Sequence, residues 1–368
     1  MRLAFVTETY PPEINGVALT VQSLVERLRE RGHRVELTRP RQPGDDRATP
    51  DDEFRVPSHA LPRYPGLRFG WPAGRELRAA CALGIPVLTG FHTRFDQYLG
   101  HYGAAALEPV VIVWLRRFHN RAQATLVPTR ALQEELTQRG IRNAMVLPRA
   151  INGERFAPCR RSEALRTSWG LGPSDLAVLY VGRLAPEKNL DLLVAAFRAI
   201  AAQRADAKLV IVGEGPALGL LREAVPQAVF CGLRTGVELA THYASGDLFV
   251  FPSLSETYGN VTIEALASGV PVVAFAQGAA LEYVHNGSSG ITVAPDDAAG
   301  FVEACVALGV SREERAAIAA RARAEVAGLD PQQVAVDFEN LVKTFTHGAG
   351  ALTLPVIPPA VMEGGGVP

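Results

Sequence analysis

The sequence predicts an α/β protein with two parallel, doubly wound sheets, and three observations lead to this prediction. Short apolar runs alternate with helical patterns along most of the 368 residues. The runs are apolar throughout, as strands are when helices cover both faces of a sheet. The alternation also occurs twice, on either side of a polar stretch from 149 to 168. Each half is therefore expected to form its own sheet, with the two domains facing each other across a cleft.

In the first half, helical patterns separate the expected strands, as in βαβ units. A helix is predicted from Val17 to Arg31, and Gly32 is suited to end it. The expected strands lie at 3–9, 34–39, 86–91, 124–128 and 144–147.

The second half repeats the pattern more regularly. Its expected strands lie at 177–181, 208–212, 229–231, 248–251, 271–275 and 291–293, each followed by a helical pattern. We place a first, acceptor-side domain at 1–154 and a second, donor-binding domain at 155–330. A helix at 331–346 is expected to pack back toward the first domain. Residues 347–368 are rich in Gly and Pro with little charge, so a disordered tail is expected there.

Composition limits the partners of the chain. It has 48% hydrophobic residues, 20% charged residues and a net charge of −1, which gives no reason to expect a nucleic-acid partner. Residues 1–154 nevertheless carry a charge of +5 and the remainder −6. A basic first half would suit an anionic membrane surface, or be only an arginine-rich exterior. With four scattered cysteines, no signal peptide and no spanning apolar run, we expect a cytoplasmic protein.

Ligands of open parallel sheets bind beyond the carboxyl ends of the strands, so the residues that follow each strand are informative. Arg183 and Lys188 follow the run at 177–181 at the start of a helix. Two cations at this place can bind a diphosphate, helped by helix-start amides. Gly213, after the run at 208–212, would let the backbone approach a ligand closely.

The most informative stretch is 252–271, PSLSETYGNVTIEALASGVP. Glu256 lies in the loop after a strand, and Glu264 follows at a spacing that can turn both carboxylates toward the cleft. Carboxylates there can accept hydrogen bonds from sugar hydroxyls. Gly259 and Asn260 would offer amides at a helix N-terminus to a negative group.

These motifs together resemble the retaining GT-B glycosyltransferases of family 4. The resemblance rests on G-R-L-x-x-E-K-N, V-G-E-G-P and an E-x7-E element, which cover most of 176–295. T-E-T-Y-P-P-E-I-N-G-V and F-H-T-R-F-D-Q-Y extend it to the first half. They are similar to the branch with bacterial lipid-linked mannosyltransferases and sulfoquinovosyl- or glucosyl-diacylglycerol synthases. The resemblance implies transfer of a hexose from a nucleotide sugar to a lipid or glycan acceptor. Mannose is the first expectation for this hexose.

The resemblance also implies roles for single residues. His92, Arg183, Lys188 and Glu256 would act on the transferred sugar and the departing diphosphate, and Asp96 and Tyr98 would line the acceptor side. The donor-binding set would be Gly16, Gly213, Gly232, Leu233, Tyr258, Gly259, Asn260 and Glu264. Since no D-x-D triplet occurs, no metal and no other cofactor are expected.

The sequence departs from the family between 69 and 85. Relatives carry a further strand and a glycine-containing loop there, whereas this chain shows a single helical pattern starting at Phe69. A strand-helix unit is therefore expected to be missing from the first sheet, which would expose a central strand edge. Arg94 also stands where asparagine is common in this branch.

Several alternatives stay open. The chain could bind sugar nucleotides without turnover because of the shortened first domain, or be a GT-B-like epimerase. A dinucleotide oxidoreductase is disfavoured because no G-x-G-x-x-G follows a first strand. The stretch from Val110 to Arg121 could bind the inner membrane face or form a buried core helix.

Overall fold

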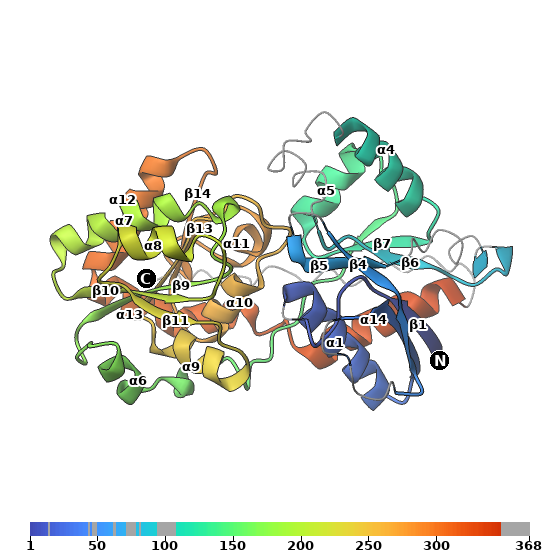
Figure 1. Ribbon diagram of the computed structural model, residues 1–368, viewed down its shortest axis with the longest axis horizontal. Coiled ribbons are helices and arrows are strands. Elements are labelled where there is room, and N and C mark those ends of the chain that lie inside the picture. Colours follow the sequence, from blue (N-terminus) through green and yellow to red (C-terminus); the bar gives the residue numbers. More distant parts are fainter. Residues whose placement is uncertain are drawn as a thin grey trace, which may run out of the picture.

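A computed structural model shows two α/β lobes side by side (Figure 1). The structure describes residues 1–13, 15–42, 45, 50–61, 64–70, 79–80, 82–93 and 108–346. The predicted tail at 347–368 lies outside these residues. The α/β class and the parallel sheets predicted from the sequence are confirmed.

The C-terminal lobe contains a six-stranded parallel sheet in the order β11-β10-β9-β12-β13-β14. Its strands are β9 (Leu176–Val181), β10 (Ala207–Val212), β11 (Val229–Gly232), β12 (Leu248–Phe251), β13 (Val272–Phe275) and β14 (Gly290–Val293). All residues of β9 and β12 are buried, as expected for strands covered on both faces. All six predicted strands of this half are therefore present.

Helices cover both faces of this sheet, with α7 and α12 on one side and α6 and α9 on the other (Figure 1). The helices are α6 (Glu163–Ser168), α7 (Leu190–Gln203), α8 (Leu218–Ala224), α9 (Gly236–Ser245), α10 (Asn260–Ala267), α11 (Gly278–Tyr283), α12 (Ala298–Val310) and α13 (Arg312–Ala322). Short 3-10 helices are η2 (Pro158–Arg160), η3 (Pro186–Lys188) and η4 (Arg323–Val326). One large core cluster joins sheet and helices.

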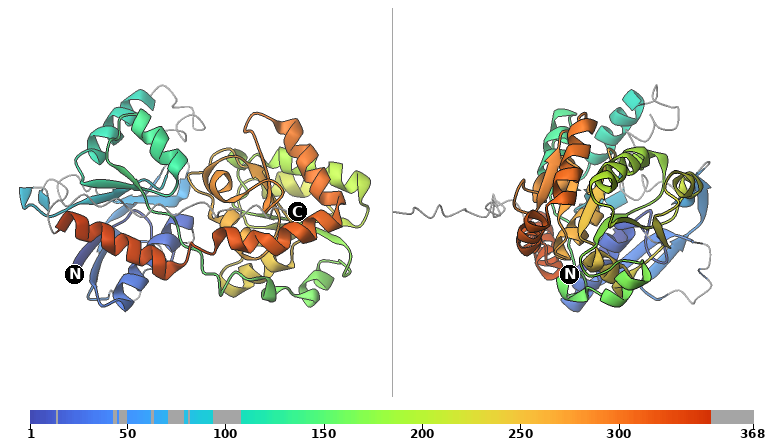
Figure 2. Two further views of the ribbon diagram at one scale, coloured as in Figure 1. Left: turned by 180° about the vertical axis from the view of Figure 1, so that it is seen from behind. Right: turned by 90° about the vertical axis from the view of Figure 1, so that its left-hand side faces the viewer.

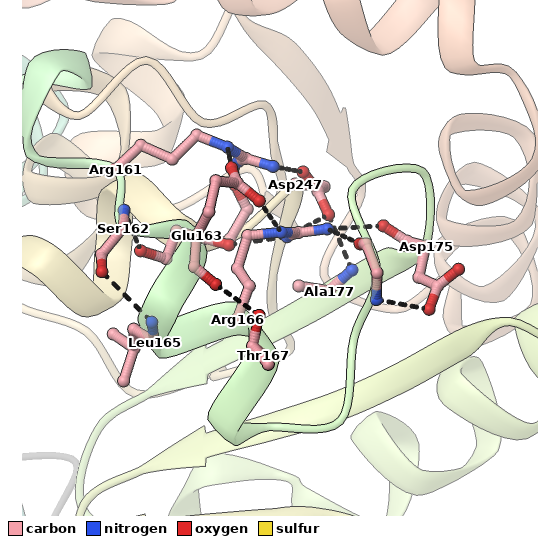
Figure 3. A network of polar contacts seen from close by, with 12 residues as sticks. Arg161, Ser162, Glu163, Leu165, Arg166, Thr167, Asp175, Ala177 and Asp247 are labelled. Carbon is pink, nitrogen blue, oxygen red and sulfur yellow. Dashed lines mark hydrogen bonds and ion pairs between the residues drawn. The ribbon is translucent and has the colours of Figure 1, made fainter.

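A buried arginine fixes α6 to the start of β9 (Figure 3). The Arg166 guanidinium donates to Asp247 Oδ2 at 2.8 Å and to the carbonyls of Ser245 and Asp175. The same Asp247 oxygen accepts the amide of Ala177, 2.8 Å away. Because Asp247 balances the cation, the burial of Arg166 is offset by an ion pair and hydrogen bonds.

The N-terminal lobe has two three-stranded parallel sheets, ordered β1-β2-β3 and β6-β7-β8, in the described residues. Their strands are β1 (Arg2–Val6), β2 (Arg34–Pro40), β3 (Glu53–Val56), β6 (Leu88–Gly90), β7 (Ala124–Val127) and β8 (Ala144–Val146). No pairing between described strands joins the two sheets. Among the described strands, β1 and β6 therefore each have a partner strand on one side only.

The helices of this lobe are α1 (Gly16–Glu30), α4 (Glu108–His119) and α5 (Arg130–Gln138). The side chain of Asn15 caps α1 by accepting the amides of Val17 and Ala18. This cap explains why the helix begins one residue before the predicted start.

The prediction of one helical pattern from Phe69 is wrong at its beginning. Phe69 and Gly70 end β5 (Tyr64–Gly70), which pairs antiparallel with β4 (Ser58–Leu61). β3, β4 and β5 are not among the strands predicted from the sequence. Pro and Gly interrupt β5, and β3 carries charged residues, so neither has the apolar run of a covered strand.

Helix α14 (Pro331–Thr346) returns to the N-terminal lobe and packs along α1 (Figure 2). Phe338, Leu341 and Val342 form one core cluster with Val25, Leu28, Val35 and Leu126. Glu339 adds an ion pair to Arg31, with an N–O distance of 2.6 Å. The chain therefore crosses between the lobes twice.

Candidate active site

Lys188 and Glu256 are brought together from the ends of two neighbouring strands. Lys188 ends η3, after β9, and Glu256 follows β12. Nζ of Lys188 lies 2.5 Å from Oε1 of Glu256, and the Ser253 hydroxyl donates to the same oxygen at 2.7 Å. β9 and β12 are adjacent where the strand order reverses, which is where open α/β sheets bind ligands.

Arg183 lies in the turn between β9 and η3. Its guanidinium is paired with Glu187 one turn further on, and 38% of its side chain stays exposed. Burial lowers the pKa of Arg183. With Lys188, the turn presents two cations on the same segment, as the sequence predicted.

Glu264 lies on α10 and accepts a hydrogen bond of 2.9 Å from the hydroxyl of Tyr243. Burial raises the pKa of the Glu264 carboxyl to about 7, although the Tyr243 hydroxyl acts in the opposite direction. A half-buried carboxyl with one oxygen bound to Tyr243 has hydrogen-bonding capacity left for a ligand.

The turns after β10 and β11 lie close to the turn after β9. A Cβ on Gly213 would lie 2.0 Å from the carbonyl oxygen of Gly182, so only glycine fits there. Gly232 has a φ of 68°, and the amide of Leu233 lies 3.5 Å from Glu214 Oε1. Leu233 is half exposed, so its side chain is accessible for contact with a ligand.

Gly16 and Asn260 meet across the two lobes. Asn260 begins α10, directly after Gly259 with a φ of 87°, and its side-chain amide donates to the carbonyl of Gly16 at 3.2 Å. A Cβ on Gly16 would lie 3.1 Å from the Asn260 side-chain nitrogen. The N-termini of α1 and α10 therefore lie together at the junction of the lobes.

Arg149 occupies the same junction. Its guanidinium donates to Asn260 Oδ1 at 3.0 Å and lies over the ring of Tyr258, with 5.2 Å to the centroid. The Tyr258 ring is fully buried beneath it. In the sequence, Arg149 is the first residue of the polar stretch between the domains and is not a predicted site residue. The rule that ligands bind after strand ends, applied to the strand at 144–147, would have singled it out.

His92 follows β6. Its backbone carbonyl oxygen lies 3.5 Å from the guanidinium of Arg149, which donates to it. Among the described residues, its buried Nδ1 has no hydrogen-bond partner. Burial, and to a lesser degree the nearby Arg149, lowers the pKa of His92 to about 3. The imidazole is therefore neutral at physiological pH.

Some predicted residues cannot be placed. Asp96 and Tyr98, like Arg94, lie outside the described residues. Within the described part of the chain, no group of three or more His, Cys, Asp or Glu side chains is arranged to hold a metal ion. Sequence reasoning did not single out Ser253, Tyr243 or Glu187, because their contacts to the predicted residues depend on side-chain directions.

Comparison with known proteins shows the family and the fold of this chain. Residues 175–309 match the family described as Glycosyl transferases group 1, and residues 71–155 match Glycosyltransferase Family 4. The HepE protein of Anabaena in complex with UDP superposes with a TM-score of 0.72 at 17% identity, covering 94% of this chain and all of that one. The fold is therefore that of the GT-B glycosyltransferases, with two Rossmann-like lobes.

Sequence relatives narrow the class. A GDP-mannose-dependent alpha-mannosyltransferase of Mycobacterium tuberculosis is 35% identical over 350 residues, covering 87% of this chain and 91% of the relative. An alpha-monoglucosyldiacylglycerol synthase of Streptococcus pneumoniae is 27% identical over 313 residues, covering 74% of this chain and 71% of the relative. This chain belongs to the family 4 glycosyltransferases.

Proposed function

We propose that this glycosyltransferase moves mannose from GDP-mannose to a lipid-linked acceptor, with the anomeric configuration retained. The mannose donor is supported by the mycobacterial relative, which is described as GDP-mannose-dependent. The lipid acceptor is supported by the streptococcal relative, whose product is a glycosylated diacylglycerol.

The observation that carries the proposal is the contact between Lys188 and Glu256 beside Arg183, at the carboxyl edge of the donor-side sheet. When the bond between sugar and diphosphate breaks, negative charge grows on the departing diphosphate. Arg183 and Lys188 would stabilise this charge. Glu256 would turn from Lys188 to the sugar hydroxyls, and Glu264 would accept hydrogen bonds from the ribose.

His92 would hold the transferred sugar from the opposite lobe. A neutral imidazole can donate to or accept from a sugar hydroxyl, and it adds no positive charge next to the developing oxocarbenium ion. The low pKa of about 3 supports this role, because His92 stays neutral across the physiological range.

We propose that charge neutralisation needs no metal, because two side-chain cations serve the diphosphate. Removal of divalent ions with EDTA is then expected to leave the initial transfer rate unchanged. A rate that falls and returns with Mg²⁺ or Mn²⁺ would contradict this part of the proposal.

Membrane attachment would come from the outer face of α4. Val110 and Trp114 are 66% and 59% exposed, and the exposed Arg117 follows on the same face at helical spacing. The exposed Arg121 lies in the turn just after the end of α4. A partly exposed tryptophan beside cations suits the headgroup region of an anionic leaflet. The exposure of Trp114 argues against the alternative of a wholly buried helix. No helix among the described residues is long and apolar enough to cross a bilayer.

A panel of GDP- and UDP-sugars tests the proposal, with diacylglycerol and lipid extract as acceptors. Labelled mannose is expected to enter the lipid fraction from GDP-mannose only. Transfer from a UDP-hexose alone would contradict the donor assignment. Donor binding without transfer to any acceptor would favour the alternative of a non-catalytic binder. The separation of the described N-terminal strands into two sheets is the observation that favours this alternative.

A further inference from the structure

Arg149 is a buried cation that forms no ion pair among the described residues, and Glu256, the carboxylate that acts on it electrostatically, is itself paired with Lys188. Its side chain lies between the lobes and 5% of the residue is exposed. Its polar contacts are the amide oxygen of Asn260 at 3.0 Å and a long contact of 3.5 Å to the carbonyl of His92. Nε has no hydrogen-bond partner in the described part of the chain. Neither contact neutralises the guanidinium.

Other buried arginines in the described residues are balanced. Arg39 pairs with Asp45 and Arg166 with Asp247 (Figure 3). Arg315 binds the carbonyls of Leu308 and Gly309 near the end of α12, where the helix dipole is negative. A buried charge without such compensation is costly. Arg149 therefore differs from the arginines that serve the fold.

The surroundings of Arg149 fit an anion. The helices α1 and α10 both direct their positive ends to this point, and Gly16 brings the backbone close to the guanidinium. Glu256, which is paired with Lys188, lies near enough to act electrostatically on Arg149, and the side chain of Asn260 binds Arg149 directly. Burial lowers the pKa of Arg149 to about 10, so the side chain is still charged at neutral pH.

We propose that Arg149 is a third diphosphate-binding cation of this enzyme, and that the diphosphate of the bound donor supplies its missing counter-ion. The inference rests on the proposed function, since it needs a nucleoside diphosphate in the cleft. Arg149 precedes the first crossover between the lobes and Asn260 belongs to the C-terminal lobe. A hydrogen bond from Arg149 to the phosphate would therefore link donor binding to the approach of the two lobes.

Calorimetric titration of the full chain with GDP, UDP and guanosine tests the proposal. Arg149→Met is expected to weaken binding of the preferred diphosphate about 10- to 100-fold, as for a lost hydrogen bond to a charged group. Guanosine, which lacks phosphates, should bind the variant as it binds the wild type. Arg149→Lys should give an intermediate loss. Arg323→Met, an arginine that binds backbone carbonyls at the second crossover, is the matched control and should change nothing.

Thermal unfolding separates binding from a purely structural role. The unliganded Arg149→Met variant should unfold no lower than the wild type, because an unbalanced buried cation is removed, whereas pyrophosphate should raise its midpoint less than that of the wild type. A lower unliganded midpoint with an unchanged pyrophosphate shift, or equal losses for GDP and guanosine, would overturn the proposal. If the wild type binds neither GDP nor UDP, the proposed function itself fails, and this is visible without any variant.

Discussion

The two lobes are both α/β, but in the described residues they differ in how their strands are joined. The C-terminal lobe has one six-stranded sheet around one large core cluster. The described N-terminal strands form two separate sheets over two small clusters. In β9 every residue is buried, whereas β1 alternates between exposed and half-buried residues, and Val6 is 61% exposed.

The candidate site residues are also distributed unequally between the two lobes. Arg183, Lys188, Glu256 and Glu264 all come from the C-terminal lobe, where buried strands fix their loops. The N-terminal lobe contributes Gly16, His92 and Arg149, which reach the cleft from its edge. We expect the continuous core of the C-terminal lobe to hold a diphosphate in one geometry, and the two separate sheets of the N-terminal lobe to adjust more easily to an acceptor.

The largest effect is expected from Lys188→Met, which tests whether the C-terminal lobe carries the chemistry. Loss of the cation that faces the departing diphosphate should lower kcat about 100- to 1000-fold. Initial rates with GDP-mannose measure this, and Lys208→Met, whose ammonium binds the carbonyl of Trp169, is the control. A kcat within a few-fold of the wild type would remove Lys188 from the mechanism.

A pair of core substitutions tests the independence of the lobes. Phe338→Ala and Phe301→Ala each remove a buried ring and should each cost about 3–5 kcal/mol. Phe338 belongs to the N-terminal cluster and Phe301 to the C-terminal one. Hydrogen exchange should accelerate mainly in α1, β1, β2 and β6 to β8 for Phe338→Ala and in β9 to β14 for Phe301→Ala. Equal acceleration in both lobes would mean that they unfold as one unit.

The pH dependence of donor binding tests whether the ionised carboxylate of Glu264 binds the donor. Its pKa of about 7 lies above the ordinary value of 4.5, so the folded protein holds a proton there between these pH values. A protonated carboxyl accepts ribose hydroxyls poorly, so GDP affinity should fall about tenfold from pH 8 to pH 6. Glu264→Gln should abolish this dependence. For the same reason, the contribution of Glu264 to stability falls as pH rises from about 4.5 to 7.

The smallest effect concerns the outer surface of the N-terminal lobe. Arg117→Gln on α4 should weaken binding to phosphatidylglycerol vesicles about fivefold, as expected for one cation near an anionic surface. Sedimentation with vesicles measures the partition. Arg312→Gln, an exposed arginine at the start of α13 in the other lobe, should leave binding unchanged. Equal losses for both variants would show that no single face of the molecule meets the membrane.

The sequence predicted the C-terminal lobe better than the N-terminal one for a physical reason. Strands covered on both faces, such as β9 and β12, are continuous apolar runs that can be recognised directly. β3 reads Glu-Phe-Arg-Val, and its Glu53 forms ion pairs with Arg55 of the same strand and with Arg39 of β2. Its stability comes from partners distant in sequence, which a local pattern does not reveal.

The same limit applies to the site. The predicted cations and carboxylates could be found because each follows a strand end. That Lys188 would contact Glu256, 68 positions away, depends on β9 lying next to β12. Arg149 was missed since its surroundings in the sequence are those of a linker, and only the assembled junction shows that it is buried.

The return of α14 to the N-terminal lobe also has a consequence for biosynthesis. The ribosome makes β1 to β8 first, yet Phe338, Leu341 and Val342 of α14 complete the cluster that these elements begin. The lobe made first can therefore close its core only after the whole of the second lobe has been synthesised. Until then Val25, Leu28 and Val35 stay without their cover, and the nascent chain would depend on chaperones to shield them.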